Sequence, residues 1–374
     1  MMQNENRIRI GNQTAFMAAS PLEPFYYAVE NGFDAFEWFP DKKENGAGWD
    51  LGDIQEQTRS EIRETAGSHD MLLTVHIPWW TSPLRPEAEE VFQEQILFAG
   101  QIGAGLINLH LSIEAGVEQY AAALLPAIRA TREAGLRLAV ENTPLTPPEA
   151  FNRLFAWWGE QRDVSISHVG MCLDLGHANL CEATRNDYIR YLDQLGPQVP
   201  IIHMHLHENY GDRDSHLPIF TGPAGQNDAG VRAALERLVK RGFCGTIILE
   251  QWPEPHSLLR DGRTRLLDIL KGYQPPAKKQ RPPPAAAPSE VATVEVPVKK
   301  ERLEKPRRKK ATARKPASVP PKKPEESLFF NALVKMDRKR RSWREKLEGT
   351  LTLLADENFS PTSDNRTYLA IYLR

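Results

Sequence analysis

The sequence predicts an α/β protein whose first 274 residues form a (β/α)8 barrel. Eight short apolar runs recur along this stretch, amphipathic segments with helical spacing lie between them, and polar residues end several of the runs. A doubly wound open sheet is the alternative, but no glycine-rich phosphate loop follows the first run to favour it. We therefore expect a closed parallel barrel.

The expected strands are the apolar runs, which have the length of buried parallel strands. In chain order they are Ala15–Ala19, Ala35–Phe39, Leu72–Pro78, Leu106–Leu111, Arg137–Asn142, Val169–Leu175, Ile201–His207 and Thr246–Trp252. The expected helices are segments whose apolar residues recur every three or four positions, most clearly Pro86–Ile102, Gly116–Ala134 and Asn227–Lys240.

The last hundred residues differ from the rest in charge and composition. Residues 275–374 hold 24 Lys+Arg against 12 Asp+Glu, whereas residues 1–274 hold 23 against 37. Because 12 of the 29 prolines lie within 275–324, we expect residues 275–326 to be a disordered Lys/Arg/Pro-rich linker. Apolar residues return with helical and then strand spacing, which predicts a small C-terminal helical and strand segment over 327–374.

Charge and composition also restrict the partners and the compartment. An acidic barrel is a poor face for DNA, whereas the basic tail is a candidate contact for a nucleic acid or an acidic protein. A solvated spacer is the simpler interpretation of the same tail. Three cysteines exclude a disulfide scaffold, and neither a signal peptide nor a membrane-spanning stretch is evident. We therefore expect a cytoplasmic protein with no membrane partner.

Polar residues with metal-binding side chains end six of the expected strands. They are His76, His110, Glu141, Asp174 with His177, His205 and Glu250. The carboxyl ends of barrel strands converge on one mouth, so these side chains are expected to meet there. A lone histidine at a strand end is usually a packing residue, but buried carboxylates need a cation or hydrogen bonds. The set as a whole predicts a metal site.

Four further residues are weaker candidates. Asp214 and His216 follow the seventh expected strand in a loop and are candidates for a further metal or for substrate. Glu37 ends the second expected strand and is a candidate substrate contact, although a surface carboxylate is an equal alternative. Trp79 lies just past His76 and is a candidate pocket wall, although apolar packing is the commoner use of such a ring.

Four short motifs carry a family resemblance over about residues 10–272. They are VENT at 140–143, CLDLGH at 172–177, HLHEN at 205–209 followed by Asp214-x-His216, and ILE at 248–250. Together they resemble the xylose isomerase-like TIM-barrel superfamily, which includes sugar and sugar-phosphate isomerases and epimerases and the endonuclease IV family. The resemblance says nothing about the last hundred residues.

The resemblance to the ketose 3-epimerases of this superfamily implies one divalent ion, Mn, Mg or Co. The implied ligands are Glu141, Asp174, His205 and Glu250. The two glutamates would also be catalytic, since one removes the proton beside a carbonyl and the other returns it. The implied substrate is a sugar, sugar phosphate or polyol, with His177 near it. Gly211 stands where those epimerases have an arginine.

The resemblance to endonuclease IV implies instead a multinuclear zinc phosphodiesterase that acts on abasic DNA. Nine positions of its ligand set match in residue type, namely His76, His110, Glu141, Asp174, His177, His205, Asp214, His216 and Glu250. The acidic barrel counts against this alternative, although the basic tail would supply some attraction for DNA. A non-catalytic binding or scaffold protein is the third hypothesis, and the intact carboxylate set disfavours it.

Overall fold

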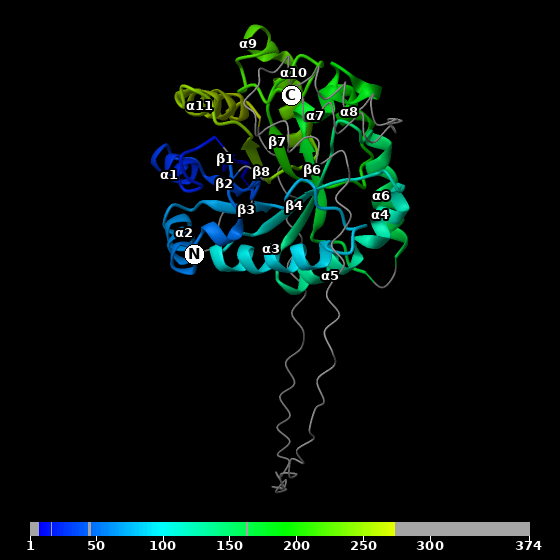
Figure 1. Ribbon diagram of the computed structural model, residues 1–374. Coiled ribbons are helices and arrows are strands. Elements are labelled where there is room, and N and C mark those ends of the chain that lie inside the picture. The colour runs from blue at the N-terminus through cyan, green and yellow to red at the C-terminus, as the bar shows by residue number, and fades with distance from the viewer. Residues whose placement is uncertain (1–6, 16, 44–45, 162–163, 274–374) are drawn as a thin grey trace, which may run out of the picture. The chain divides into compact units, whose positions relative to one another are not determined.

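The computed structural model describes residues 7–15, 17–43, 46–161 and 164–273 (Figure 1). Within them eight parallel strands close into a barrel in chain order, with β8 paired to β1. The strands are β1 (Arg9–Gln13), β2 (Ala35–Trp38), β3 (Leu72–His76), β4 (Leu106–His110), β5 (Arg137–Glu141), β6 (Val169–Asp174), β7 (Ile201–Leu206) and β8 (Thr246–Leu249). The predicted (β/α)8 barrel is thereby confirmed.

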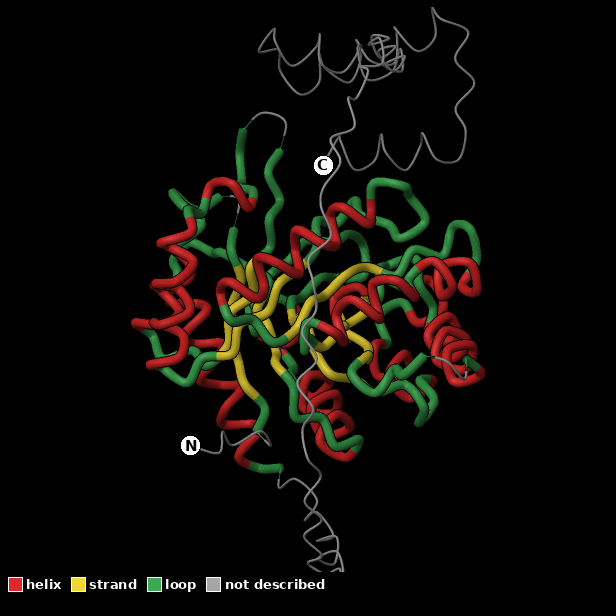
Figure 2. Tube along the Cα trace, turned by 90° about the horizontal axis from the view of Figure 1, so that it is seen from below, coloured by secondary structure: helices red, strands yellow, loops and turns green. Residues whose placement is uncertain are grey.

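Helices surround the strands (Figure 2). The α-helices are α1 (Glu23–Glu30), α2 (Glu56–Ser68), α3 (Ala88–Ile102), α4 (Val117–Ala123), α5 (Leu125–Glu133), α6 (Pro148–Glu160), α7 (Leu175–Leu180), α8 (Tyr188–Gln194), α9 (Pro223–Gln226), α10 (Ala229–Lys240) and α11 (Ser257–Lys271). Two 3-10 turns join them, η1 (Leu51–Asp53) and η2 (Glu182–Thr184). No helix in the described ranges is long and apolar enough to cross a membrane. The predicted linker and C-terminal segment lie outside the described residues.

The first strand differs from the prediction. In the expected run Ala15–Ala19 the described residues, Ala15 and 17–19, belong to no strand, and β1 comes earlier at Arg9–Gln13. Charge hides this strand in the sequence, because Arg9 is buried within it and its guanidinium is bonded to Asp70. A buried, paired arginine breaks the apolar pattern by which a parallel strand is recognised.

The predicted helix Gly116–Ala134 is two helices, α4 and α5, which meet at Leu124. Pro126 occupies the first turn of α5. Proline has no backbone N–H to donate to the preceding turn, so it is tolerated at a helix start and not in a helix interior. The amphipathic spacing continues across the break, which is why the sequence pattern merges the two helices.

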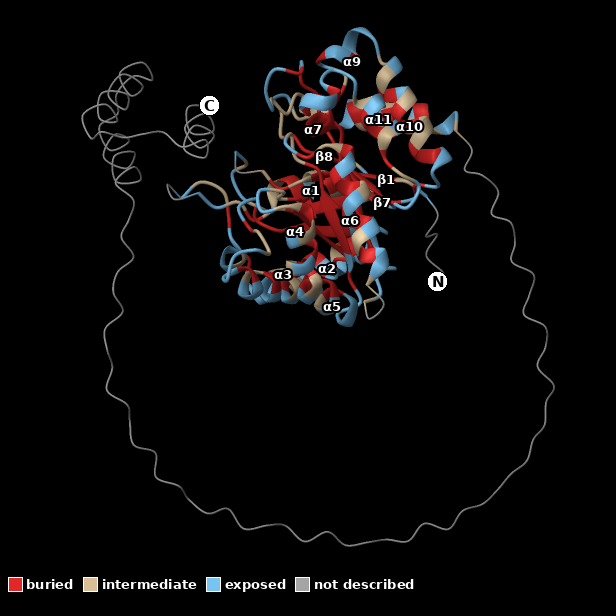
Figure 3. Cartoon of the chain, turned by 90° about the vertical axis from the view of Figure 1, so that its right-hand side faces the viewer, coloured by how far each residue is buried: buried red, intermediate tan, exposed pale blue. Residues whose placement is uncertain are grey.

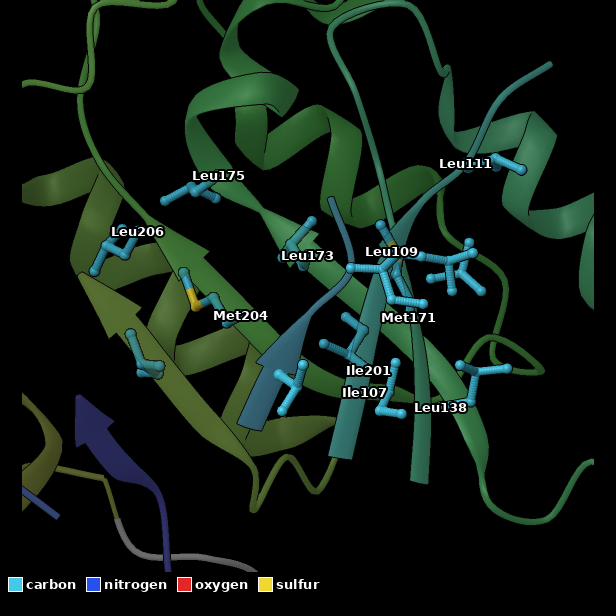
Figure 4. Close-up of a cluster of buried hydrophobic side chains, with 14 of the residues drawn as sticks. Ile107, Leu109, Leu111, Leu138, Met171, Leu173, Leu175, Ile201, Met204 and Leu206 are labelled. Carbon is cyan, nitrogen blue, oxygen red and sulfur yellow. The ribbon is translucent and has the colours of Figure 1, made fainter. Parts of the chain in front are cut away.

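Each strand separates apolar from polar side chains. Burial is concentrated on the strands and on the inner faces of the helices (Figure 3). On β4, Asn108 and His110 contact Glu141 inside the barrel, so the alternate residues Ile107 and Leu109 face the helices. Figure 4 shows these two in a cluster of buried side chains that spans β4 to β7. The larger apolar core therefore lies between sheet and helices, while the barrel interior holds the polar groups and a small apolar cluster of Leu106, Ala139, Cys172 and Ile202.

Gly11 sets the distance between β1 and β2. A Cβ atom at this position would lie 2.3 Å from the carbonyl oxygen of Ala35 and 2.5 Å from its carbonyl carbon. We expect Gly11→Ala to lower the free energy of unfolding by about 1–3 kcal/mol, because backbone cannot yield as a side chain does. Thermal and urea unfolding would measure this.

Gly159→Ala is the matched control for that substitution. Gly159 is exposed in α6, and no atom lies within 4 Å of a Cβ built there. Alanine at this position should be neutral or stabilising by up to about 1 kcal/mol. Equal stability of the two variants would contradict the assigned role of Gly11.

Candidate metal centre

Four buried side chains from the last four strands form the primary group. Glu141 ends β5, Asp174 ends β6, His205 lies on β7, and Glu250 directly follows β8. Each offers one ligand atom, and these atoms lie within 4.8 Å of one another. Nδ1 of His205 is 3.2 Å from Glu141 Oε2 and 3.0 Å from Glu250 Oε1. The structure thus brings together the four residues expected to bind a metal.

Two more expected residues lie against Glu141. His76 Nε2 is 3.1 Å from Glu141 Oε2, and His110 Nε2 is 3.4 Å from Glu141 Oε1. Asn108, which was not expected in the site, donates to the same carboxylate. Glu141 therefore joins the primary group to the histidines of β3 and β4.

A second group lies beside the first and consists of His177, His207, Asp214 and His216. His177 Nε2 and His216 Nε2 are each 3.2 Å from Asp214 Oδ2. His207 was not among the expected site residues, yet its Nε2 is 3.2 Å from Asp174. Imidazole nitrogens and a carboxylate oxygen make a donor set that suits zinc.

The chain after β6 places the residues that connect the two groups. Asp174 caps α7 by accepting from the backbone N–H of His177 at 2.7 Å. Asn142 holds Asp174 from the neighbouring strand, accepting from its N–H at 2.8 Å and donating to its carbonyl at 2.9 Å. Gly176 has no side chain because a Cβ would lie 2.0 Å from the His207 ring. Within the CLDLGH motif, Asp174 is thus required as the helix cap and Gly176 for close approach to His207.

Several of these histidines have one nitrogen at a backbone carbonyl and the other at a carboxylate. Nδ1 of His76 donates to Ile77 at 2.6 Å, and Nδ1 of His177 donates to Asn142 at 2.8 Å. The other ring nitrogen lies beside a carboxylate. Its lone pair would be repelled there unless that nitrogen carries a proton or binds a cation. Buried atoms without a hydrogen-bond partner include both ring nitrogens of His205, Glu37 Oε1, Glu141 Oε1 and Glu250 Oε2. Those of the primary group fit a divalent cation.

Electrostatics within the groups favour an ionised Glu141 and protonated His205 and His216 when only protons are available. Burial opposes charge on Glu141, but His205 and His110 lower the pKa of its carboxyl group well below the usual value. Burial likewise opposes protonation of His205, but its acidic neighbours raise its pKa well above the usual value. Burial acts the same way on His216, and Asp214 and Glu250 raise its pKa to about 9.

The other two weaker candidates, Glu37 and Trp79, lie in different surroundings. Glu37 is fully buried and contacts His203, His205 and Thr74, so it has no surface for a substrate. Trp79, the expected pocket wall, lies in the loop after β3 and is 44% exposed, so its ring remains accessible to a ligand. His203 and His207 alternate with His205 in the run HMHLH, which predicts a shared face but does not separate ligands from packing residues. Asn108 has no separate signal, because it lies beside the stronger candidate His110.

The metal-free protein should lose stability as the pH rises from about 6.5 to about 9. The pKa of His216 is about 9 in the folded chain against 6.5 ordinarily, so its contribution is complete below pH 6.5 and is lost on passing pH 9. Melting temperatures of the chelator-treated protein would show this fall, and His216→Gln should reduce it.

Divalent metal should act in the opposite direction over the same pH range. Metal and proton compete for the same imidazole nitrogens, so the stabilisation by added Zn²⁺ should increase between pH 6.5 and 9. A metal-free melting temperature that stays constant or rises over this range would contradict the assigned charge states.

Comparisons with known proteins bear on this arrangement. The chain is 27% identical over 146 residues to an uncharacterised protein of Methanocaldococcus jannaschii, and the match covers 37% of this chain and 43% of that one. The chain therefore spans less than half the length of this curated relative.

Solved structures share the fold. A D-tagatose 3-epimerase-like protein is 18% identical with a TM-score of 0.54, over 70% of this chain and 97% of that one. An L-ribulose 3-epimerase is 15% identical with a TM-score of 0.54, over 71% and 95%. A D-psicose 3-epimerase is 12% identical with a TM-score of 0.52, over 71% and 98%. At these identities the likeness shows the barrel fold.

The sequence model of the family described as the xylose isomerase-like TIM barrel matches residues 25–269. This match begins within α1, ends within α11 and takes in every strand except β1. The residues that it spans include the primary and second groups. The chain belongs to the family of xylose isomerase-like TIM barrels.

Proposed function

We propose that the protein is a metal-dependent isomerase or epimerase of a sugar, a sugar phosphate or a related polyol. The observation that carries the proposal is the primary group, in which two glutamates flank one histidine nitrogen. A divalent ion bound there would polarise a substrate carbonyl as a Lewis acid. Family membership and the likeness of the fold to sugar epimerases support a small-molecule substrate.

The two glutamates would move the proton. Oxygens of Glu141 and Glu250 lie 3.2 and 3.0 Å from His205 Nδ1, so a substrate held beside this nitrogen would have both carboxylates within reach. One carboxylate would take the proton from the carbon beside the carbonyl, and the other would return a proton. Glu141 is fully buried and Glu250 is 8% exposed, so both would act in surroundings from which water is largely excluded.

Residues around the primary group would bind the rest of the substrate. His177 and His110 lie beside Glu141 and offer imidazole nitrogens to hydroxyl groups. Trp79 would provide an apolar face, since rings of this kind pack against the C–H faces of sugars. These roles would account for selectivity among sugars, while the primary group would perform the chemistry.

A second candidate function has a specific observation in its favour. The second group places three imidazoles and a carboxylate beside the primary group. An assembly of several zinc ions is the arrangement with which metal-dependent hydrolases stabilise the attacking and leaving oxygens of a phosphodiester. An endonuclease IV-like phosphodiesterase is therefore the alternative, and its contact with DNA through the basic tail stays a prediction outside the described residues.

Glu141→Gln should abolish turnover while leaving the fold intact. The amide keeps the shape of the side chain but cannot accept a proton as a carboxylate does, so kcat should fall at least about a hundredfold. Initial rates on a panel of ketoses and aldoses, with circular dichroism as the check on folding, would measure this. Glu160→Gln at the exposed end of α6 is the control, and full activity of Glu141→Gln would refute the mechanism.

Metal stoichiometry separates the two functions. Elemental analysis of protein purified without chelator should give about one Mn, Mg or Co per chain for the isomerase or epimerase. About three ions, chiefly zinc, would favour the phosphodiesterase, and an abasic-site duplex would then be the substrate to assay. No bound metal, even after reloading, would favour a binding or scaffold protein.

A further inference from the structure

A fully buried carboxylate lies beneath the primary group and belongs to none of the groups described above. Glu37 on β2 reaches across the barrel interior to β7, although β8 and β1 separate these strands in the sheet. Its Oε2 accepts from the Thr74 hydroxyl at 2.8 Å and lies 2.8 Å from Nε2 of His203. Its Oε1 lies 2.7 Å from Nε2 of His205, a close electrostatic contact that does not have hydrogen-bond geometry. Among the described residues, only histidines form ion pairs with this carboxylate.

The two nitrogens of His205 are in different surroundings. Nε2 faces Glu37, while Nδ1 faces the oxygens of Glu141 and Glu250 on the side of the mouth. A carboxylate attracts an N–H and repels a nitrogen lone pair, so Glu37 favours the tautomer with the proton on Nε2. That tautomer leaves the lone pair of Nδ1 directed at the primary group.

His203 keeps Glu37 in this orientation. Its Nδ1 is bonded to the hydroxyl of Thr246, and its Nε2 meets Glu37 Oε2. The imidazoles of His203 and His205 therefore use different oxygens of one carboxylate, and the carboxylate cannot rotate without losing one of them. A TIM-barrel interior is normally filled by bulky apolar side chains. The buried polar layer of Glu37, Thr74, His203 and Thr246 is an exception that packing alone does not explain.

We propose that Glu37 is a positioning residue that keeps the proton of His205 on Nε2 and so directs Nδ1 to the metal. The inference rests on the metal dependence in the proposed function. It assigns Glu37 a role different from the substrate contact expected from the sequence, since the carboxylate is 0% exposed and acts through His205. Carboxylates that orient ligand histidines in this way raise metal affinity and fix the coordinating nitrogen.

Glu37→Gln tests the inference through metal binding. Glutamine has nearly the same shape, but its NH2 group is a donor and only its oxygen can accept, so one histidine must change its tautomer or lose its partner. Titration calorimetry with Zn²⁺ and with Mn²⁺ should show affinity reduced about 10- to 100-fold. Thr131→Val is the control, because Thr131 is equally buried but bonds only within α5 and to His168. It should leave the affinity unchanged.

A second measurement does not depend on how well the variant folds. Histidine ¹⁵N spectra of the zinc-loaded wild-type chain, with His205→Asn used for assignment, should show His205 protonated on Nε2 and shifted by metal on Nδ1. Coordination through Nε2, or unchanged zinc affinity in Glu37→Gln, would overturn the inference while leaving the proposed function standing. A wild-type chain that binds no divalent ion would overturn both.

Discussion

Carboxylates buried inside the barrel are the constraint on which this structure depends. Glu37, Glu141 and Asp174 are completely buried and Glu250 almost so. In the part of the chain that the structure describes, the ion pairs of these four groups are made with histidines and none with lysine or arginine. An uncompensated buried charge costs several kcal/mol, so the imidazoles must carry protons or share a cation with the acids. The positive charge that balances these carboxylates is therefore either a proton on an imidazole or a bound cation, and one can replace the other.

The fold could be predicted because most strands combine an apolar outer face with short length. Seven strands, β2 to β8, begin at the residue expected from the sequence. Their carboxyl ends come one to three residues before the expected ends. The first strand could not be found in this way, since Arg9 is buried against Asp70 and contributes no apolar signal. The division of the helix near Pro126 was missed for a related reason, because amphipathic spacing continues through it. The Arg9–Asp70 ion pair places a charged residue in a buried strand, and the missing N–H of Pro126 favours a new helix start. Hydrophobic periodicity alone identifies neither feature.

The sequence indicated which residues meet at the mouth, but not what lies below it. Glu141 and Asp174 could be placed because strand ends converge, which follows from topology alone. The surroundings of Glu37 depend on the stagger of β2 against β7, and no pattern within either strand encodes that distance. His207 was not singled out as a site residue, because alternation places it on the same face as His205. In the structure it lies just after β7 and belongs to the second group, with His177, Asp214 and His216.

The distribution of the site over the two halves of the barrel has a consequence for biosynthesis. The primary group comes wholly from β5 to β8, whereas Glu37, His76 and His110 come from β2 to β4. A nascent chain thus exposes the supporting residues first and acquires its last primary ligand only when Glu250 has left the ribosome. If the proposed metal binds at the primary group, its complete set of ligands exists only after β8 has closed onto β1, so loading would be a late event. Under the proposed function, the order of the strands along the chain would therefore determine when the metal could be acquired.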